Sequence, residues 1–402
     1  MAAAESSHLP EGQRWRSIIL VQACVFASGF FFGVVIPILS VMLEQDGVST
    51  TLIGLNASMA MIAAVLAGPF VPRLARWLGL YRAMQLGLVL LLVGMLLLPT
   101  VRELNAWFGF RFLIGIGMVI HWTLIMTWLN AIVTEKNRGF ALGVNGALWG
   151  LGYAAGPALL KLVGIDRFTP FLTSGVIILG SIALLLVFRR AVPEIEIKAT
   201  RHVGHAFRMA PVIMIIAFVG GFGETGLGAM LPVYGLHSGL GIEDAILMIS
   251  VLTIGGVALQ VPFGWAADHV NRWMLMIVCI ACGIVGPALL PFAVQTAIGL
   301  WVNLFLWGGM LVGIHSIGVT LLGQRFPASE LAQANALFVM CFSAGAAGGS
   351  FASGSAMAAW DPHGLPVLIG TIFMALMIYT LFCRPWRSER AERALKAGEG
   401  PG

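Results

Sequence analysis

Apolar residues form long runs along almost the whole chain, and short polar segments separate them. Each run holds about 20 residues, the length that an α-helix needs to cross a hydrocarbon core of about 30 Å. Within lipid a chain must satisfy its backbone hydrogen bonds internally, and a helix does so within a single segment. The pattern therefore predicts an all-α integral membrane protein.

Twelve spans are predicted from the points where charged or turn-forming residues interrupt the apolar runs. The first six are residues 17–43, 52–74, 83–99, 105–130, 140–163 and 170–188, and the second six are 209–233, 245–266, 273–291, 298–322, 331–358 and 365–382. The longest polar interruption predicts an N-terminal six-helix bundle (1–188), a cytoplasmic linker (189–208), a C-terminal six-helix bundle (209–383) and a cytoplasmic tail (384–402).

The composition agrees with a membrane protein and excludes other classes. Charged residues make up 10% of the 402 residues and the mean hydropathy is +0.93, whereas soluble proteins carry about 25% charged residues. A soluble enzyme, a nucleic-acid-binding protein and a disulfide-bonded secreted domain are thereby excluded. The five cysteines lie within or at the ends of apolar runs, so we expect no disulfide framework, no metal site and no cofactor.

The positions of lysine and arginine predict the orientation of the chain. Nineteen of the 23 fall on one side of the twelve spans and three on the other, while Arg111 lies inside a span. Positive residues gather on the cytoplasmic side, so both termini are expected in the cytoplasm of a multi-pass protein of a bacterial inner membrane. We expect membrane lipid to surround a monomer that has no nucleic-acid partner.

The two halves of the chain resemble each other at an offset of 190 to 195 residues. Pro37 then matches Pro232, and His121 matches His315. Such an offset indicates a duplicated bundle. Because six crossings separate matched positions, the two halves run in the same direction, and a site is expected between them near the bilayer midplane.

Four motifs resemble those of the major facilitator superfamily, and the resemblance covers the whole chain. The segment from Pro262 to Arg272 is similar to the G-x-x-x-D-R-x-G-R loop, with Asp268 as its acid, and a degenerate copy containing Arg76 follows the second span. Arg111 begins a segment similar to R-x-x-x-G-x-G, and the fifth span resembles the antiporter pattern G-x8-G-x3-G-P. The resemblance implies two parallel six-helix bundles with alternating access, gated on the cytoplasmic side by Asp268, Arg272 and Arg76.

Within this superfamily the chain looks most like the YcaD-like branch. The similarity rests on W-L-N at 128–130, on L-P at 231–232 and on L-Q at 259–260. An acid commonly precedes the first of these segments in that branch, whereas Met126 stands in its place here. A coupling scheme based on that acid therefore does not carry over.

Few ionisable groups lie inside the predicted spans, where a charge costs about 3 kcal/mol on insertion scales. Glu224 is a carboxylate well inside the seventh span and a candidate proton carrier, although it could instead hold this span to a neighbour. Arg111 shares a helical face with Trp122 and could bind an anionic or electron-rich substrate group, or it could reach the membrane interface. His121 and His315 are further candidates for proton coupling, with a packed histidine as the alternative.

Amide and indole side chains share helix faces in the fifth and tenth spans. Asn145 and Trp149 lie one turn apart, as do Asn303 and Trp307. These side chains, together with Trp122, could bind a flat molecule with polar edges by stacking and hydrogen bonding. The alternative is that they pack helices through polar contacts and small residues.

These features favour a secondary active transporter. A membrane-embedded enzyme needs a nucleophile with its base, paired acids or a metal cluster, and no such set stands at workable spacing. A channel needs a continuous polar stripe or charged rings. We expect a small-molecule substrate that is neutral or weakly anionic and aromatic or heterocyclic, such as the vitamin riboflavin, moved together with protons. Proton-antiport efflux of drugs or metabolites is the alternative, and import and export stay open.

Overall fold

The computed structural model describes residues 11–101, 103–133, 138–164, 166, 168–189, 204–326 and 328–383. Helices account for nearly all of this part of the chain. They are α1 (Glu11–Gln45), α2 (Thr50–Ala67), a short 3₁₀ turn η1 (Gly68–Phe70), α3 (Val71–Leu78), α4 (Leu80–Leu97), α5 (Leu104–Ile132), α6 (Arg138–Val163), α7 (Thr169–Val187), α8 (Gly204–Met209), α9 (Pro211–His237), α10 (Ile242–His269), α11 (Arg272–Ala293), α12 (Ala297–Arg325), α13 (Ala328–Ala359) and α14 (Gly364–Cys383).

Every predicted span coincides with a helix. Among the described residues, eleven helical segments are long and apolar enough to cross a membrane, with α2, η1 and α3 forming one of them. The remaining predicted span, 140–163, is helical as α6. The helices extend beyond the predicted spans because helical hydrogen bonding continues through polar residues; α1 begins at Glu11 instead of residue 17. Most of the predicted linker and all of the predicted tail lie outside the described residues.

The second span contains an interruption that apolar periodicity does not indicate. Pro69 and Pro72 lie close together and neither has a backbone N–H to donate to the preceding turn. The 3₁₀ turn η1 therefore separates α2 from α3. The segment α3 carries exposed Arg73 and Arg76.

At the starts of three helices, side-chain oxygens accept hydrogen bonds from backbone N–H groups that have no partner within the helix. Asp166 accepts hydrogen bonds from the backbone of Phe168 and Thr169 before α7, and these bonds lower the pKa of the Asp166 carboxyl. Asn271 accepts from the backbone at the start of α11, and Thr296 does so at the start of α12. Such caps fix where each helix begins.

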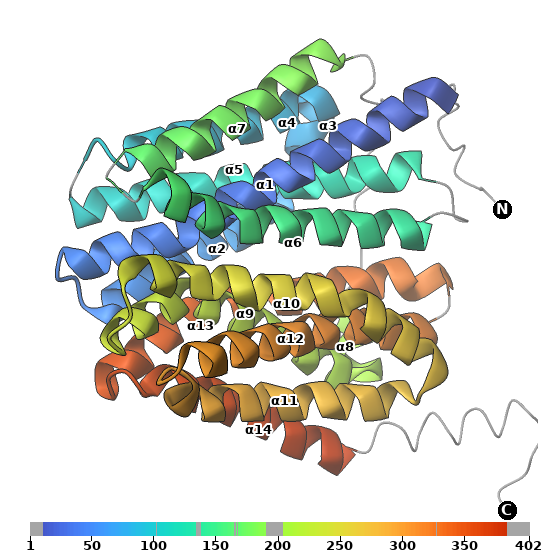
Figure 1. Cartoon of the computed structure of the whole chain (residues 1–402). Helices are drawn as coiled ribbons and strands as arrows, with labels where there is room; N and C mark the ends of the chain where they lie inside the picture. Colours follow the sequence, from blue (N-terminus) through green and yellow to red (C-terminus); the bar gives the residue numbers. More distant parts are fainter. Residues whose placement is uncertain are drawn as a thin grey trace, which may run out of the picture.

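The helices form two halves that lie side by side (Figure 1). The N-terminal half contains α1 to α7, and the C-terminal half contains α8 to α14. Contacts between the halves are made chiefly by α2 with α13, α6 with α10 and α1 with α9. The interface thus consists of three helix pairs, each with one helix from either half.

The bundle has two distinct ends, which Figure 1 shows on its right and left. We call the end at which α1 begins and α14 ends the proximal end. The opposite end, where α1, α9 and α13 finish, is the distal end. Every long helix runs from one end to the other.

Glycines bring α1 and α6 into close contact within the N-terminal half. A Cβ atom on Gly29 or Gly33 of α1 would meet the backbone of α6, and a Cβ atom on Gly152 or Gly156 of α6 would meet the backbone of α1. Small residues at such positions let two helix backbones approach. Gly152 and Gly156 of the antiporter-like pattern therefore have a packing role in this fold.

Candidate functional site

Three aromatic side chains form a row inside the N-terminal half. The rings of Trp122 on α5 and Trp149 on α6 meet edge to face, with centroids 6.3 Å apart. Trp149 also stacks on Tyr153, one turn further along α6, at 5.1 Å and an interplanar angle of 21°. Trp122 and Trp149 are half-buried and Tyr153 is buried. Two predicted substrate-binding residues are thus brought together with Tyr153, which the sequence analysis missed.

Arg111 lies inside the bundle, near this row. The side chain is 2% exposed, and its Nε donates a hydrogen bond to Oδ1 of Asn56 on α2 at 3.2 Å. Its Nη2 is buried without a hydrogen-bond partner in the described structure. The guanidinium also acts electrostatically on Tyr153. Arg111 is therefore held by a neighbouring helix and does not extend to the membrane surface.

Glu224 lies across the interface, in the middle of α9. Its side chain keeps solvent-accessible surface. One turn on, a Cβ atom at Gly228 would lie 3.0 Å from the Tyr153 hydroxyl, so this face of α9 looks toward α6. The Glu224 carboxylate also acts electrostatically on Tyr153.

These residues place two opposite charges around one phenol. Arg111 belongs to the N-terminal half, Glu224 belongs to the C-terminal half, and Tyr153 feels the charge of both. Neither charge forms an ion pair with another described residue. An arginine can hold an electron-rich group of a ligand, and a carboxylate can take up and release a proton. The structure therefore brings both of these chemical capacities close to one phenol.

The two matched histidines have different surroundings. His121 is buried in α5 beside the backbone of Cys24, and neither ring nitrogen has hydrogen-bond geometry with a partner in the described structure. His315 of α12 keeps solvent-accessible surface. Its ring meets Phe338 and Phe342 of α13 edge to face, each at 5.4 Å.

The predicted amide–indole pairs also differ from each other. Asn145 is buried one turn before Trp149, and its Nδ2 is unpartnered among the described residues. Asn303 instead donates from Nδ2 to the carbonyl oxygen of Gly286 on α11 at 3.1 Å. Trp307 packs against the same glycine. The structure thus places Asn303 and Trp307 at the contact between α12 and α11, away from the aromatic row.

The predicted gating residues all belong to the proximal end. Arg76 is exposed on α3, and Arg272 begins α11. The Asp268 side chain lies outside the part of the chain that the structure describes. Their role in gating stays a prediction.

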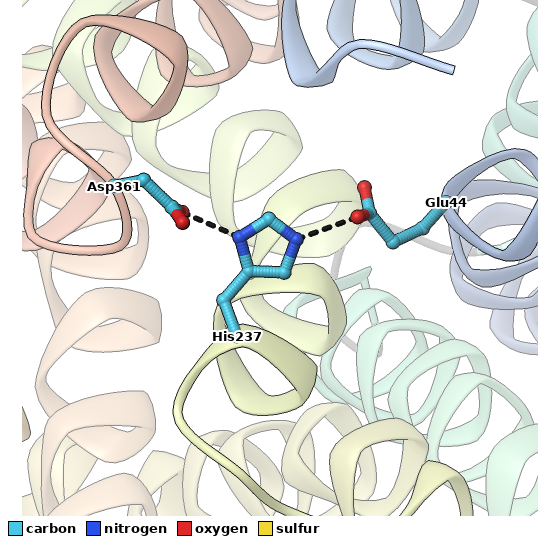
Figure 2. Close-up of polar contacts among 3 residues, drawn as sticks. All are labelled: Glu44, His237 and Asp361. Atoms are coloured by element: carbon cyan, nitrogen blue, oxygen red, sulfur yellow. Dashed lines mark hydrogen bonds and ion pairs between the residues drawn. The ribbon is translucent and has the colours of Figure 1, made fainter. Parts of the chain in front are cut away.

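Polar contacts close the interface at the distal end. His237 ends α9 and contacts two carboxylates: its Nε2 lies 2.6 Å from Oε1 of Glu44 at the end of α1, and its Nδ1 contacts Asp361 after α13 (Figure 2). Lys161 of α6 pairs with Asp244 of α10 at 3.3 Å. The sequence analysis missed both sets because charged residues next to a span resemble ordinary loop residues.

Neutral contacts extend this closure toward the middle of the molecule. Ser250 of α10 donates from Oγ to the carbonyl oxygen of Ala154 on α6 at 2.7 Å, and the backbone N–H of Phe351 donates to Ser58 Oγ at 3.1 Å. Gly54 of α2 lies directly against the backbone of α13. A recess of about 370 Å³ remains at the distal end. Its walls are formed by Glu44, Gly47, Val48, Ser49, Thr50, His237, Met357, Ala358 and Asp361.

A regular spacing could have revealed Tyr153. It follows Asn145 and Trp149 at i+8 and i+4 on one face of α6. Asn56 gives no comparable signal, because its partner Arg111 is far away in the sequence. Within the described residues, no group of His, Cys, Asp and Glu is arranged to hold a metal ion.

Comparison with known proteins gives consistent matches along the chain. The sequence model of the Major Facilitator Superfamily matches residues 22–320 and 247–401. The chain is 29% identical to "Uncharacterized MFS-type transporter YfkF" of Bacillus subtilis (strain 168), over 91% of this chain and 95% of that protein. It is 21% identical to "Uncharacterized MFS-type transporter YcaD" of Escherichia fergusonii, over 80% of this chain and 82% of that protein.

Solved structures with the same architecture include a nucleoside transporter. The crystal structure of the nucleoside transporter NupG superposes with a TM-score of 0.72 at 15% identity, over 92% of this chain and 96% of that one. A mutant of NupG gives a TM-score of 0.75 at 16% identity, over 91% of this chain and 99% of that one. At this identity the likeness shows a common fold.

Proposed function

Because the chain belongs to the Major Facilitator Superfamily, we propose that it moves a small solute by alternating access through the cavity between its two halves. The family match and the similarity to YfkF and YcaD confirm the predicted membership and the predicted likeness to the YcaD branch. Family and fold indicate a secondary transporter rather than an enzyme. Cargo, coupling and orientation are proposed below from the residues of this chain.

We propose that the proximal end faces the cytoplasm. The positive-inside tendency supports this orientation, because the described basic residues gather at the proximal end, with Lys161 at the distal end. The proximal ones are Arg14, Arg16, Arg73, Arg76, Arg82, Arg189, Arg208, Arg272 and Arg325. In a Cys383→Ser background, an impermeant thiol reagent added outside cells should label Gln45→Cys and spare Trp77→Cys; the reverse result would overturn the orientation.

Glu224 is the proposed carrier of the coupling proton. Its side chain keeps solvent-accessible surface on a helix of the interface and has no hydrogen-bond partner among the described residues. Such a group can exchange its proton in each transport cycle without breaking a structural contact. His315, which also keeps solvent-accessible surface, is the second candidate, and His121 the third.

The proposed cargo is a flat, neutral or weakly anionic aromatic or heterocyclic solute, for which riboflavin is one example. The single observation that carries this proposal is the row of Trp122, Trp149 and Tyr153, with Arg111 and Glu224 both near Tyr153. Aromatic rings stack on a flat solute, while Arg111 and Asn145 each keep a buried donor without a partner. A fixed cation disfavours organic cations as cargo.

Proton-antiport efflux remains the second candidate, and the structure weakens its sequence support. Gly152 and Gly156, which resemble the antiporter pattern, are in direct contact with the backbone of α1. A packing role within one half would require these glycines in an importer as much as in an exporter, so they do not indicate the direction of transport. The direction of transport therefore has to come from a transport assay.

Thermal stabilisation of the purified protein tests the cargo class, since a ligand that binds the folded state raises the melting temperature. The panel should contain flavins, nucleosides, aromatic acids and cationic drugs. We expect a neutral or weakly anionic heterocycle to stabilise the wild type and Trp77→Ala, a matched variant with an exposed tryptophan, and to stabilise Trp149→Ala less at the same ligand concentration. Stabilisation by organic cations alone would contradict the proposal, as would equal stabilisation of Trp149→Ala.

A further inference from the structure

His237 occupies an unusual place at the distal end, between carboxylates from different parts of the chain. Nε2 lies 2.6 Å from Oε1 of Glu44, which belongs to α1 of the N-terminal half. Nδ1 contacts Asp361, which lies between α13 and α14 of the C-terminal half. Figure 2 shows the ring between the two acids, with one nitrogen directed toward each.

The chemistry of these contacts requires a charged ring. An ionised carboxylate only accepts hydrogen bonds, and a neutral imidazole has only one N–H to donate. Both contacts can be hydrogen bonds only when both nitrogens carry protons. The arrangement therefore matches an imidazolium that bridges Glu44 and Asp361.

The contact between His237 and Glu44 crosses the interface between the halves. It stands at the rim of the recess that Thr50 also lines, and the backbone of Thr50 is in direct contact with Gly354 of α13. Opening the distal end would separate α2 from α13 and α1 from α9. The contact to Glu44 would break in that movement, whereas the contact to Asp361 stays within one half.

We propose that His237 is a proton-operated latch of the distal gate. With a proton on the ring, His237 bridges Glu44 and Asp361 and holds the distal end closed. After the proton leaves, one ring nitrogen can no longer donate, the contact across the interface weakens and the gate opens more readily. The latch is thus strongest at low pH and is lost as the pH rises and the ring deprotonates.

This proton differs from the one that drives transport. His237 lies in a recess that opens at the distal end, so its proton comes from the distal solution and returns to it. The latch sets the gate equilibrium without moving a proton across the membrane. It rests on alternating access between the two halves, and it depends neither on Glu224 nor on the nature of the cargo.

Other titratable groups surround this end of the molecule. They are Tyr234 on α9 itself, Asp46 after α1, His363 after α13, Glu243 and Asp244 at the start of α10, and Lys161 on α6. Carboxylates, lysines and tyrosines ordinarily titrate outside the range from about pH 5.5 to about 8.5. His363, whose ring meets Trp360 at 5.8 Å, is therefore the second histidine at this end and the natural control.

The test measures the distance across the distal gate as the pH changes. Spin labels at Gln45→Cys and Ala359→Cys, one in each half, are introduced into the full chain with Cys383→Ser, and the protein is placed in lipid nanodiscs. We expect the ratio of closed to open distances to fall at least about fivefold from about pH 5.5 to about 8.5. The ratio should be low and independent of pH in His237→Gln and in Glu44→Gln, and His363→Gln should behave as the wild type.

Two results would overturn the latch: an unchanged pH response in His237→Gln, or a response that disappears in His363→Gln and persists in both other variants. A wild type without any pH response would overturn it as well. The variant Glu224→Gln distinguishes the latch from the proposed proton coupling. The gate of this variant should keep its pH response even if the variant no longer accumulates cargo. His237→Gln should in turn keep accumulation that is sensitive to an uncoupler.

Discussion

Polar side chains at the distal end and those in the middle of the interface differ in the contacts that they make. At the distal end, His237 contacts two carboxylates, Lys161 pairs with an aspartate and Ser250 donates to a carbonyl oxygen. In the centre, Nη2 of Arg111 and Nδ2 of Asn145 are buried without partners among the described residues. The charged groups at the distal end are thus paired with one another, although Oε2 of Glu44 and the Tyr234 hydroxyl are buried without partners there too, whereas Arg111 in the centre forms no ion pair with a described residue.

This difference indicates what each region does. A buried polar group without a hydrogen bond costs about 1–3 kcal/mol, so a ligand that bonds to Arg111 or Asn145 would remove such a cost. A transported solute can do so in the centre. The paired groups at the distal end stabilise one closed arrangement of the two halves, and that arrangement must be broken in each cycle.

The largest effect is expected from blocking closure of the distal end. In Gly54→Val the added side chain would collide with the backbone of Ser350 on α13, and overpacking of this kind costs about 1–3 kcal/mol. Transport should fall by up to about 100-fold while ligand binding survives. Gly180→Val is the matched control, because a Cβ atom there meets nothing within 4 Å. Normal transport by Gly54→Val would show that the distal contact is not part of the cycle.

The next effect concerns the cation of the central cavity. Arg111→Gln removes the charge, and a hydrogen bond to a charged group contributes about 1.5–3 kcal/mol. The dissociation constant of the cargo found by thermal stabilisation should therefore rise about tenfold or more. Arg82→Gln, at an exposed position on α4, controls for loss of charge. Equal affinities of the two variants would remove Arg111 from the binding site.

A smaller effect should separate cavity tryptophans from packing tryptophans. Trp149→Ala loses a stacked neighbour worth about 0.5–1.5 kcal/mol, so cargo affinity should fall about 2- to 12-fold. Trp307→Phe changes a side chain that packs on Gly286, so it should lower the melting temperature and leave cargo affinity unchanged. If Trp307→Phe weakened binding and Trp149→Ala did not, the cavity would have to be relocated to the C-terminal half.

The smallest effect belongs to the exposed ion pair at the distal end. Lys161 and Asp244 have side-chain exposures of 44% and 49%, and such pairs contribute about 0–1 kcal/mol. Lys161→Gln should shift the closed-to-open ratio by less than about fivefold, and high salt should mask the shift. A larger shift, unaffected by salt, would mean that this pair and not His237 controls the gate.

The fold was largely predictable because each membrane helix can be recognised from its own run of apolar residues. The helical membrane fold followed from the local apolar pattern, and the family followed from the resemblance of four motifs. The interruption at η1 was not predicted, since Pro69 and Pro72 lie within an otherwise apolar run. Helix ends such as Glu11 were placed too far inward, because helices continue past the edge of the hydrocarbon.

The site was predictable only in part, because contacts between helices are not local. Reasoning along each helix grouped Trp122 with Arg111 and Trp149 with Asn145, whereas the contact between Trp122 and Trp149 comes from the packing of α5 on α6. Tyr153 continues the spacing of Asn145 and Trp149. The sequence predicts equivalent roles for His121 and His315, yet His121 is buried and His315 keeps solvent-accessible surface. Nothing local distinguishes them, since their neighbours come from α1 in one case and from α13 in the other.

Glu224→Gln tests the central claim most directly, namely that the middle of the interface binds cargo and couples it to protons. In proteoliposomes loaded with the identified cargo, the variant should lose accumulation driven by a proton gradient and keep counterflow exchange, which needs no net proton movement. Glu243→Gln, at an exposed position at the start of α10, should accumulate as the wild type does. Accumulation by Glu224→Gln at the wild-type level, still abolished by an uncoupler, would contradict the account.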